Sequence, residues 1–119
     1  MFTNMFFMRD NYKIVMLKKS CNFNLEVIEL YNELLLNGKK PIADRILSSA
    51  ISGSGNLQRL LHISKGRELK KATEEAIVNF KNVIYWIEQC VKSGYWFDEK
   101  LLKDAFEILD FCQRKEFVY

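Results

Sequence analysis

Apolar residues recur at three- and four-residue steps in four separate stretches of the chain, which is the spacing of helices with one buried face. The first stretch runs from about Lys13 to Leu36, and the second from about Pro41 to Leu61. The third covers Arg67 to Ser93, and the fourth begins at Asp98 and ends near Gln113. The pattern therefore predicts an all-α protein of four amphipathic helices.

The buried faces follow from the same spacing. In the first helix they are predicted to comprise Ile14, Leu17, Cys21, Leu25, Ile28 and Leu35, with Val27, Tyr31 and Leu34 on a neighbouring line. In the third helix the stripe is Leu69, Ala76, Phe80, Val83, Ile87 and Cys90. In the fourth it is Leu101, Leu102, Ala105, Ile108, Leu109 and Cys112. These residues are the expected core.

The helices are separated by short connections. Gly38 and Gly94 stand where helix C-terminal caps are expected, Pro41 suits a first turn and Asp98 suits an N-cap. Short connections favour antiparallel neighbours, so we expect an antiparallel up-down-up-down four-helix bundle. We assign residues 12–116 to this single domain and residues 1–11 to a ragged N-terminal segment.

The second predicted helix contains the stretch Ser52-Gly53-Ser54-Gly55-Asn56, which is poor helix sequence because each glycine costs about 1 kcal/mol relative to alanine. It lacks the lysine and the preceding strand of a phosphate-binding loop. Two interpretations stay open: a small-residue surface where two helices approach closely, or a kink in the helix.

Composition narrows the class of protein. The 119 residues are 49% hydrophobic and 28% charged, which fits one globular domain. The three cysteines form no CxxC pair and are expected to be reduced thiols, with one intermolecular disulfide as the alternative. No signal peptide and no uncharged run of about 18 residues is evident, so we expect a cytoplasmic protein without membrane contact.

Catalytic patterns are scarce. His62 is the only histidine, so one subunit cannot form a histidine-based metal site or a pair of catalytic histidines. The carboxylate pair Glu74-Glu75 falls on a helix surface, where solvated side chains are usual. We therefore expect no enzymatic activity, no cofactor and no metal site.

Basic residues are concentrated in the middle of the chain, where the segment from Lys39 to Lys71 contains eight lysines and arginines and only two acidic residues. In an antiparallel bundle the end of the second helix meets the start of the third, which predicts a basic pole. A clustered positive field suits the phosphate backbone of RNA or DNA. The predicted contacts are Arg59, Lys65, Arg67, Lys70 and Lys71, supported by Arg45. The alternative is a solvated charge run without a partner.

The side of the third helix opposite its core stripe is uncharged, although a helix facing water usually carries Lys and Glu there. The residues of this strip are Val78, Asn82, Tyr85, Trp86 and Gln89. An uncharged outer strip with aromatic side chains is typical of a subunit interface. We therefore predict that this face helps to form a homo-oligomer.

From Ile46 onward the chain resembles the four-helix-bundle proteins encoded in intervening sequences of bacterial 23S rRNA genes. The family signature in the second helix is matched at Ala50, Ser52, Asn56 and Leu57, and the pairs Glu68-Leu69 and Gly94-Tyr95 fall at its later motifs. This chain departs from the signature where Gln58-Arg59-Leu60 replaces Ala-Glu-Gly, where Lys65 replaces a serine, and where Asn82 replaces a glutamate.

The departures make the chain more similar to a related group, the accessory variability determinants of diversity-generating retroelements. That resemblance implies a bacterial or phage-borne accessory protein that assembles as a pentamer and binds RNA and a reverse transcriptase. A protein-binding scaffold without nucleic-acid contact is the alternative function. A composite active site between subunits has no support in the sequence.

Overall fold

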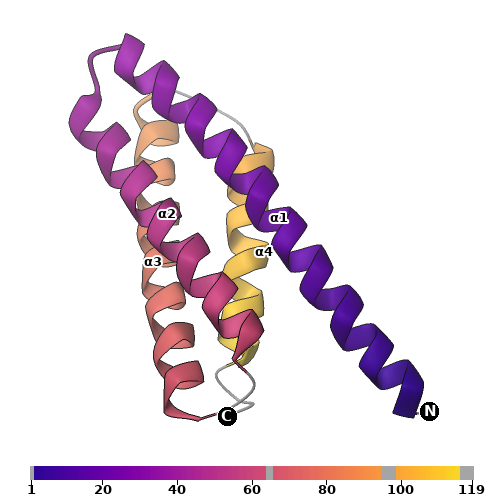
Figure 1. The fold of residues 1–119 in the computed structure, drawn as a ribbon. Coiled ribbons are helices and arrows are strands. Elements are labelled where there is room, and N and C mark those ends of the chain that lie inside the picture. Colours follow the sequence, from indigo (N-terminus) through magenta and orange to yellow (C-terminus); the bar gives the residue numbers. More distant parts are fainter. Residues whose placement is uncertain (1, 64–65, 95–98, 116–119) are drawn as a thin grey trace.

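The structure, a computed structural model, describes the backbone of residues 2–63, 66–94 and 99–115, and the side chains of residues 12–63, 66–94 and 99–114. These described residues form four helices: α1 (Phe2–Leu36), α2 (Lys40–His62), α3 (Arg67–Lys92) and α4 (Glu99–Lys115) (Figure 1). No strand occurs among the described residues. The predicted all-α fold is confirmed.

The helix bounds agree closely with the sequence pattern except at the N-terminus. α1 begins at Phe2 rather than near Lys13, so the backbone of the segment expected to be ragged is helical. No proline or glycine stands between Phe2 and Lys13, so nothing in the sequence interrupts the helix there. The 35 residues of α1 correspond to about 52 Å of helix, which matches the 53 Å longest dimension of the molecule.

The turn after α1 has the geometry expected of a glycine-capped helix. Gly38 has a φ of 71°, a conformation that residues with a Cβ rarely adopt. The Lys39 amide donates to the Leu34 carbonyl at 2.8 Å and the Gly38 amide donates to the Leu35 carbonyl at 3.1 Å. These two bonds form a Schellman motif and reverse the chain into α2. Asp98, the predicted N-cap of α4, lies outside the described residues.

Side-chain contacts establish that neighbouring helices are antiparallel. Along α1, Asn24 pairs with Ser54 while the later residue Tyr31 pairs with the earlier residue Asp44. Two further seams show the same reversal. Between α2 and α3, Arg45 pairs with Trp86 and Asn56 with Asn79; between α1 and α4, Lys19 pairs with Glu107 and Glu26 with Lys100. The helices therefore run up, down, up and down around one core.

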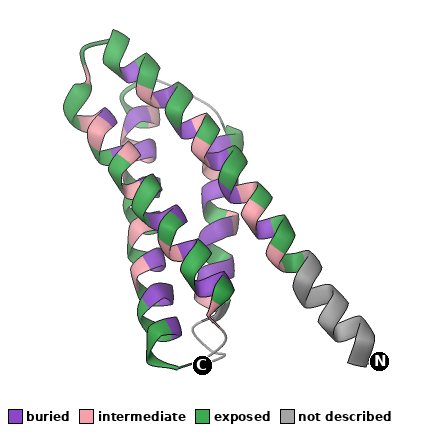
Figure 2. Cartoon of the chain, in the orientation of Figure 1, coloured by how far each residue is buried: buried purple, intermediate pink, exposed green. Residues whose placement is uncertain are grey.

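The core lies along the axis between the four helices, where buried residues from each helix face inward (Figure 2). Phe23 of α1 and Phe80 of α3 meet there with ring centroids 5.9 Å apart. The predicted stripe of α3 is buried throughout, and in α4 the predicted Leu101, Ala105, Ile108, Leu109 and Cys112 are buried too.

The predicted buried face of α1 was right for Val27 and Leu34, which are buried, and for Leu17 and Tyr31, which pack against the core, but most of the main predicted line was wrong. Ile14, Leu25, Ile28 and Leu35 are 50%, 62%, 45% and 38% exposed, and Cys21 is exposed as well. The buried face consists of Met16, Ser20, Phe23, Val27, Leu30 and Leu34. α1 carries two apolar stripes on different sides, and periodicity alone does not say which one α2 and α4 cover.

The glycine-rich stretch of α2 forms a close helix contact, and the helix continues through it. A Cβ built on Gly53 would lie 3.0 Å from Phe80 Cε2 and 3.2 Å from Asn79 Cβ, so a side chain there would meet α3. Gly55 has no neighbour within 4 Å of such an atom. Of the two interpretations, the small-residue surface is confirmed.

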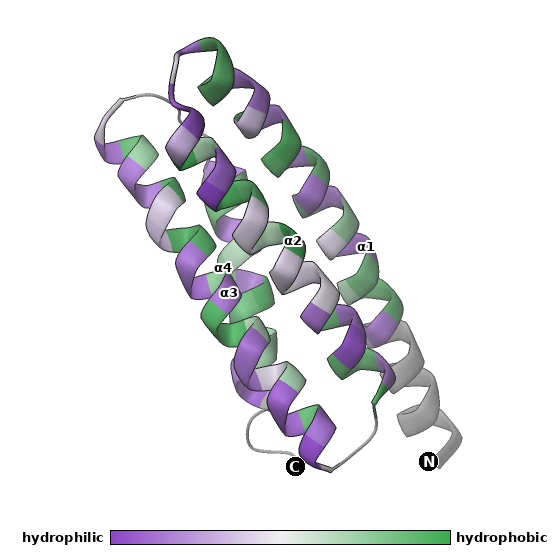
Figure 3. Cartoon of the chain, turned by 60° about the vertical axis from the view of Figure 1, so that its left-hand side comes forward, coloured by the Kyte–Doolittle hydropathy of each residue, from purple (hydrophilic) through white to green (hydrophobic). Residues whose placement is uncertain are grey.

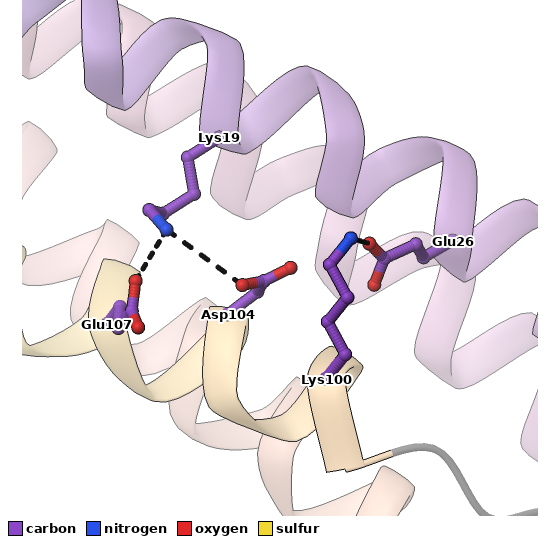
Figure 4. A network of polar contacts seen from close by, with 5 residues as sticks. All are labelled: Lys19, Glu26, Lys100, Asp104 and Glu107. Carbon is purple, nitrogen blue, oxygen red and sulfur yellow. Dashed lines mark hydrogen bonds and ion pairs between the residues drawn. The ribbon is translucent and has the colours of Figure 1, made fainter.

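The seam between α1 and α4 depends on charged groups (Figure 4). Lys19 bonds to Glu107 and lies 3.9 Å from Asp104, while Lys100 bonds to Glu26 at 2.8 Å. The hydrogen bond from Lys19 lowers the pKa of the Glu107 carboxyl. α1 is thus fixed to α4 partly by ion pairs, whereas Gly53 brings α2 directly against α3. None of the described helices combines the length and apolar character that a membrane crossing requires.

Candidate nucleic-acid interface

Four basic side chains share the end of the bundle where α2 leads into α3. Arg59 occupies the last turn of α2, and Arg67, Lys70 and Lys71 occupy the first turns of α3. All four are exposed, and the start of α3 is largely hydrophilic on its outer side (Figure 3). We call these four residues the basic end. Lys65, which was predicted to join them, lies outside the described residues.

The basic end is only partly compensated by acidic groups. Arg59 donates to Asn56 Oδ1 at 3.3 Å and lies 3.9 Å from Glu75. Arg67, Lys70 and Lys71 form no ion pair within residues 12–63, 66–94 and 99–114. No described acidic side chain therefore competes with an anionic ligand for their ammonium and guanidinium groups.

The start of α3 adds a weaker positive contribution of its own. Gly66 occupies the N-cap position with a φ of 93° and provides no side-chain hydrogen bond to the first turn. The free amides of a helix N-terminus carry partial positive charge and favour anions. Glu68 in this turn is the acidic residue nearest in sequence, and Glu74 and Glu75 mark the limit of the basic end along α3.

Arg45 does not join the basic end, so its predicted supporting role has no geometric basis. It is fourteen residues before Arg59 on a continuous helix, a separation of about 21 Å. Its guanidinium lies over the Trp86 ring, 5.1 Å from the centroid. The basic residues that the sequence places in one run are therefore divided between the two ends of α2, because the helix is continuous between Arg45 and Arg59.

Lys40, at the same end as Arg45, is paired. Its ammonium lies 2.6 Å from Asp44, which also accepts a hydrogen bond from the Tyr31 hydroxyl at 3.3 Å. The hydrogen bond with Asp44 raises the pKa of the Lys40 ammonium, and the same bond lowers the pKa of the Asp44 carboxyl. A ligand that used Lys40 would have to compete with this intramolecular pair.

The predicted outer strip of α3 is partly covered. Val78 and Tyr85 are 56% and 53% exposed and Asn82 is exposed, while Trp86 and Gln89 are half-buried. Trp86 contacts the Arg45 guanidinium and the Tyr85 ring, which meets it edge-on at 5.0 Å between centroids.

Two shallow hollows run along the groove between α2 and α3. One, of about 520 Å³, is lined by Asp44, Arg45, Ser48, Ser49, Asn82, Tyr85 and Trp86. The other, of about 430 Å³, is lined by Ser52, Asn56, Glu74, Glu75, Val78 and Asn79. Sequence reasoning missed the α2 contribution, because residues from two helices meet only through the antiparallel packing.

The remaining chemical groups are dispersed. His62 is exposed, and no three His, Cys, Asp or Glu side chains lie together as a metal site in the described part of the chain. Burial raises the pKa of the Cys90 thiol and raises the pKa of Cys112 to about 12. Cys21 is exposed. Cys21 is therefore the thiol that a solution reagent can reach first.

Comparison with known proteins identifies the fold. No protein-family model matches the chain, and no curated protein sequence matches it. Among solved structures, a protein of unknown function from the S23 ribosomal protein family of Bacteroides thetaiotaomicron superposes with a TM-score of 0.75. The two share 21% sequence identity over 86% of this chain and 95% of that one. At this level of identity the likeness shows that the two chains have the same four-helix fold.

Proposed function

We propose that this chain is a non-enzymatic accessory protein that associates with RNA through the basic end. The observation that carries the proposal is the group Arg67, Lys70 and Lys71, three exposed cations at the start of α3 that form no ion pair with any described side chain. Contacts of this kind bind phosphate groups without reading bases, and their strength falls steeply with salt. Arg59 adds a fourth contact, reduced by its proximity to Glu75.

Two resemblances support RNA as the partner. The motif around Ala50 to Leu57 resembles that of the proteins encoded in 23S rRNA intervening sequences, and the structural neighbour is assigned to the S23 ribosomal protein family. The related accessory variability determinants are pentamers that bind RNA and a reverse transcriptase. By analogy we propose a bacterial cytoplasmic homo-oligomer. Its several basic ends would bind one RNA molecule together, so that the affinity of the assembly for RNA exceeds that of one subunit.

The exposed Val78 and Tyr85 support the α3 outer strip as one surface of that oligomer. Each patch alone carries few charges, so the number of subunits determines the overall affinity.

The test is binding of nuclease-treated protein to a fluorescent structured RNA at about 50 and about 200 mM salt, a range over which phosphate-dominated binding weakens strongly. The variant Lys70→Glu/Lys71→Glu should lose binding at both concentrations. Lys81→Glu/Lys92→Glu changes the charge equally on the same helix but away from the basic end, and should retain binding. Equal loss in both variants would attribute the effect to net charge and overturn the proposed site.

A protein-binding scaffold is the second candidate, favoured by the hollow of about 520 Å³ beside the exposed Tyr85. A partner docked there would be insensitive to changes at Lys70 and Lys71 but would be lost in Tyr85→Ala or Trp86→Ala. A pull-down with the two sets of variants separates this function from RNA association.

A further inference from the structure

α1 exposes an apolar stripe on the side that faces away from the bundle. The residues of this α1 stripe are Ile14, Cys21, Leu25, Ile28 and Leu35. Leu25 is 62% exposed, and Ile14 and Ile28 are 50% and 45% exposed. Figure 3 shows hydrophobic segments recurring along α1, on a helix whose inner side is already packed in the core.

The spacing of the stripe is that of a helix–helix seam. Ile14, Cys21, Ile28 and Leu35 stand seven residues apart, and Leu25 follows Cys21 by four. Apolar residues at alternating three- and four-residue steps pack against another helix in coiled coils. A helix side that faces water would normally carry charged residues at these positions. α1 therefore has the pattern of a helix that packs on two sides.

α2 extends the same apolar surface. Ile51 is 61% exposed and lies one turn before Ser54, which hydrogen-bonds to Asn24 at 2.8 Å. Ile51 therefore lies near the level of Leu25, across the seam between the two helices. The exposed parts of the α1 stripe and Ile51 amount to roughly 500 Å², a size that marks functional patches on protein surfaces. Two such patches approach the total of about 1,000 Å² that a specific interface needs.

We propose that the α1 stripe binds a second copy of this chain, with the two α1 helices antiparallel about a two-fold axis near Leu25. The orientation follows from charge. Lys18 and Glu29 flank the stripe on the same side, away from α2, and both are exposed without an ion pair among the described residues. In an antiparallel pair related by a two-fold axis, the flank that contains Lys18 and Glu29 on one helix lies beside the same flank of the other helix. Each Lys18 therefore lies opposite the partner subunit's Glu29.

A parallel pair would instead place Lys18 against the flank of α1 that contains Asn24, to which α1 contributes no acidic residue among residues 12–36. A self-complementary surface of this kind closes as a dimer, because each subunit presents the same patch to the other. The surface is separate from the α3 outer strip and from the basic end, so this contact goes beyond the proposed function and does not depend on RNA.

The test is the molar mass of the full-length, nuclease-treated protein by light scattering over a range of concentrations. The wild type should contain dimers or even-numbered assemblies. Leu25→Glu/Ile28→Glu should halve the mass, with helicity unchanged because both side chains are exposed in the subunit. Phe106→Glu on α4, where the side chain is 48% exposed and lies outside both the α1 stripe and the α3 outer strip, is the matched control and should leave the mass unchanged. A wild type that stays monomeric, or a mass that only the control lowers, overturns the proposal.

Two further readouts examine the contact itself. Cys21 should react with a maleimide slowly in the assembled wild type and rapidly in Leu25→Glu/Ile28→Glu, since Cys90 and Cys112 are buried. Lys18→Glu should weaken assembly, and adding Glu29→Lys should restore it if the helices are antiparallel. Equal Cys21 reactivity in both proteins would show that the stripe is uncovered, and failure of the double charge exchange would overturn the orientation.

Discussion

The two ends of the α2/α3 pair carry cations in very different settings. At the end where α2 begins, Lys40 lies 2.6 Å from Asp44 and the Arg45 guanidinium lies over Trp86. At the end where α3 begins, Arg67, Lys70 and Lys71 are exposed and form no ion pair among the described residues. In the sequence these residues belong to one basic run. In the fold, Lys40 and Arg45 have intramolecular partners, whereas the cations at the start of α3 have no described ion-pair partner that a ligand would have to displace.

The contrast shows why a count of charges does not locate a binding surface. A salt-bridged ammonium has an intramolecular partner that a phosphate would have to displace, and stacking on an indole fixes a guanidinium in place. A cation without a partner retains its full field toward solvent. The end at which α3 begins is therefore the better candidate for phosphate contacts, although both ends have several basic residues.

The largest expected effect comes from separating α2 from α3, the contact that holds both ends in position. Gly53→Val would place side-chain atoms against Phe80 and Asn79, where even a Cβ is 3.0–3.2 Å from its neighbours. Overpacking of this kind should lower the free energy of unfolding by about 1–3 kcal/mol. Urea denaturation followed by circular dichroism measures it.

Gly55→Ala is the matched control for this change. Its Cβ would meet no atom within 4 Å, and alanine is the better helix former, so the free energy of unfolding should rise by about 0.5–1 kcal/mol. If both substitutions shifted stability in the same direction, the close contact at Gly53 would not be the cause.

The next effect concerns Arg59, which lies within ion-pair distance of Glu75, whereas the rest of the basic end forms no ion pair in the part of the chain that the structure describes. Glu75→Gln should free its guanidinium from the group 3.9 Å away and increase affinity for RNA by about two- to fivefold at low salt, the change expected for removing one nearby negative charge. Fluorescence anisotropy measures this change. Unchanged affinity would mean that Arg59 does not contact the ligand.

At the opposite end, Arg45→Ala should leave RNA affinity unchanged and alter the environment of Trp86. Loss of the contact at 5.1 Å should cost about 0.5–1 kcal/mol of stability, the usual value for an exposed cation–π pair. Tryptophan fluorescence and thermal unfolding measure the two effects. A loss of RNA binding equal to that at Lys70 would remove the distinction between the ends.

The smallest expected effect is the pH dependence of the Lys40–Asp44 pair. Because the pKa of Asp44 is lowered in the folded protein, its contribution to stability is present above the ordinary carboxyl pKa and is lost as the pH falls through the folded value. Asp44→Asn should therefore lower Tm slightly at pH 6 and leave it unchanged at pH 2. A greater loss at pH 2 than at pH 6 would contradict the pairing.

The sequence predicted the fold class, α3 and most of α4 because each of those helices carries a single apolar stripe ended by recognisable capping residues. It failed for α1, which has two stripes, since only the packing of α2 and α4 distinguishes Phe23 and Leu30 from Leu25 and Ile28. It also left the role of Gly53 open, because a close approach to Phe80 depends on a helix distant in sequence.

The candidate site was predicted in part. Arg59, Arg67, Lys70 and Lys71 share one end because the connection between α2 and α3 is short, a feature that the sequence displays directly. The positions of Arg45 over Trp86 and of Glu75 beside Arg59 could not be predicted, because each depends on the register between two helices.

The central claim is that Arg67, Lys70 and Lys71 contact phosphate groups, and the most direct measurement is the salt dependence of RNA affinity after all three are replaced by glutamine. Each lost contact should reduce the slope of log affinity against log salt by about 0.7–0.9, so the loss of three contacts predicts a decrease of roughly 2.1–2.7. A weaker affinity with an unchanged slope would contradict it, because the three cations would then not be neutralising phosphates.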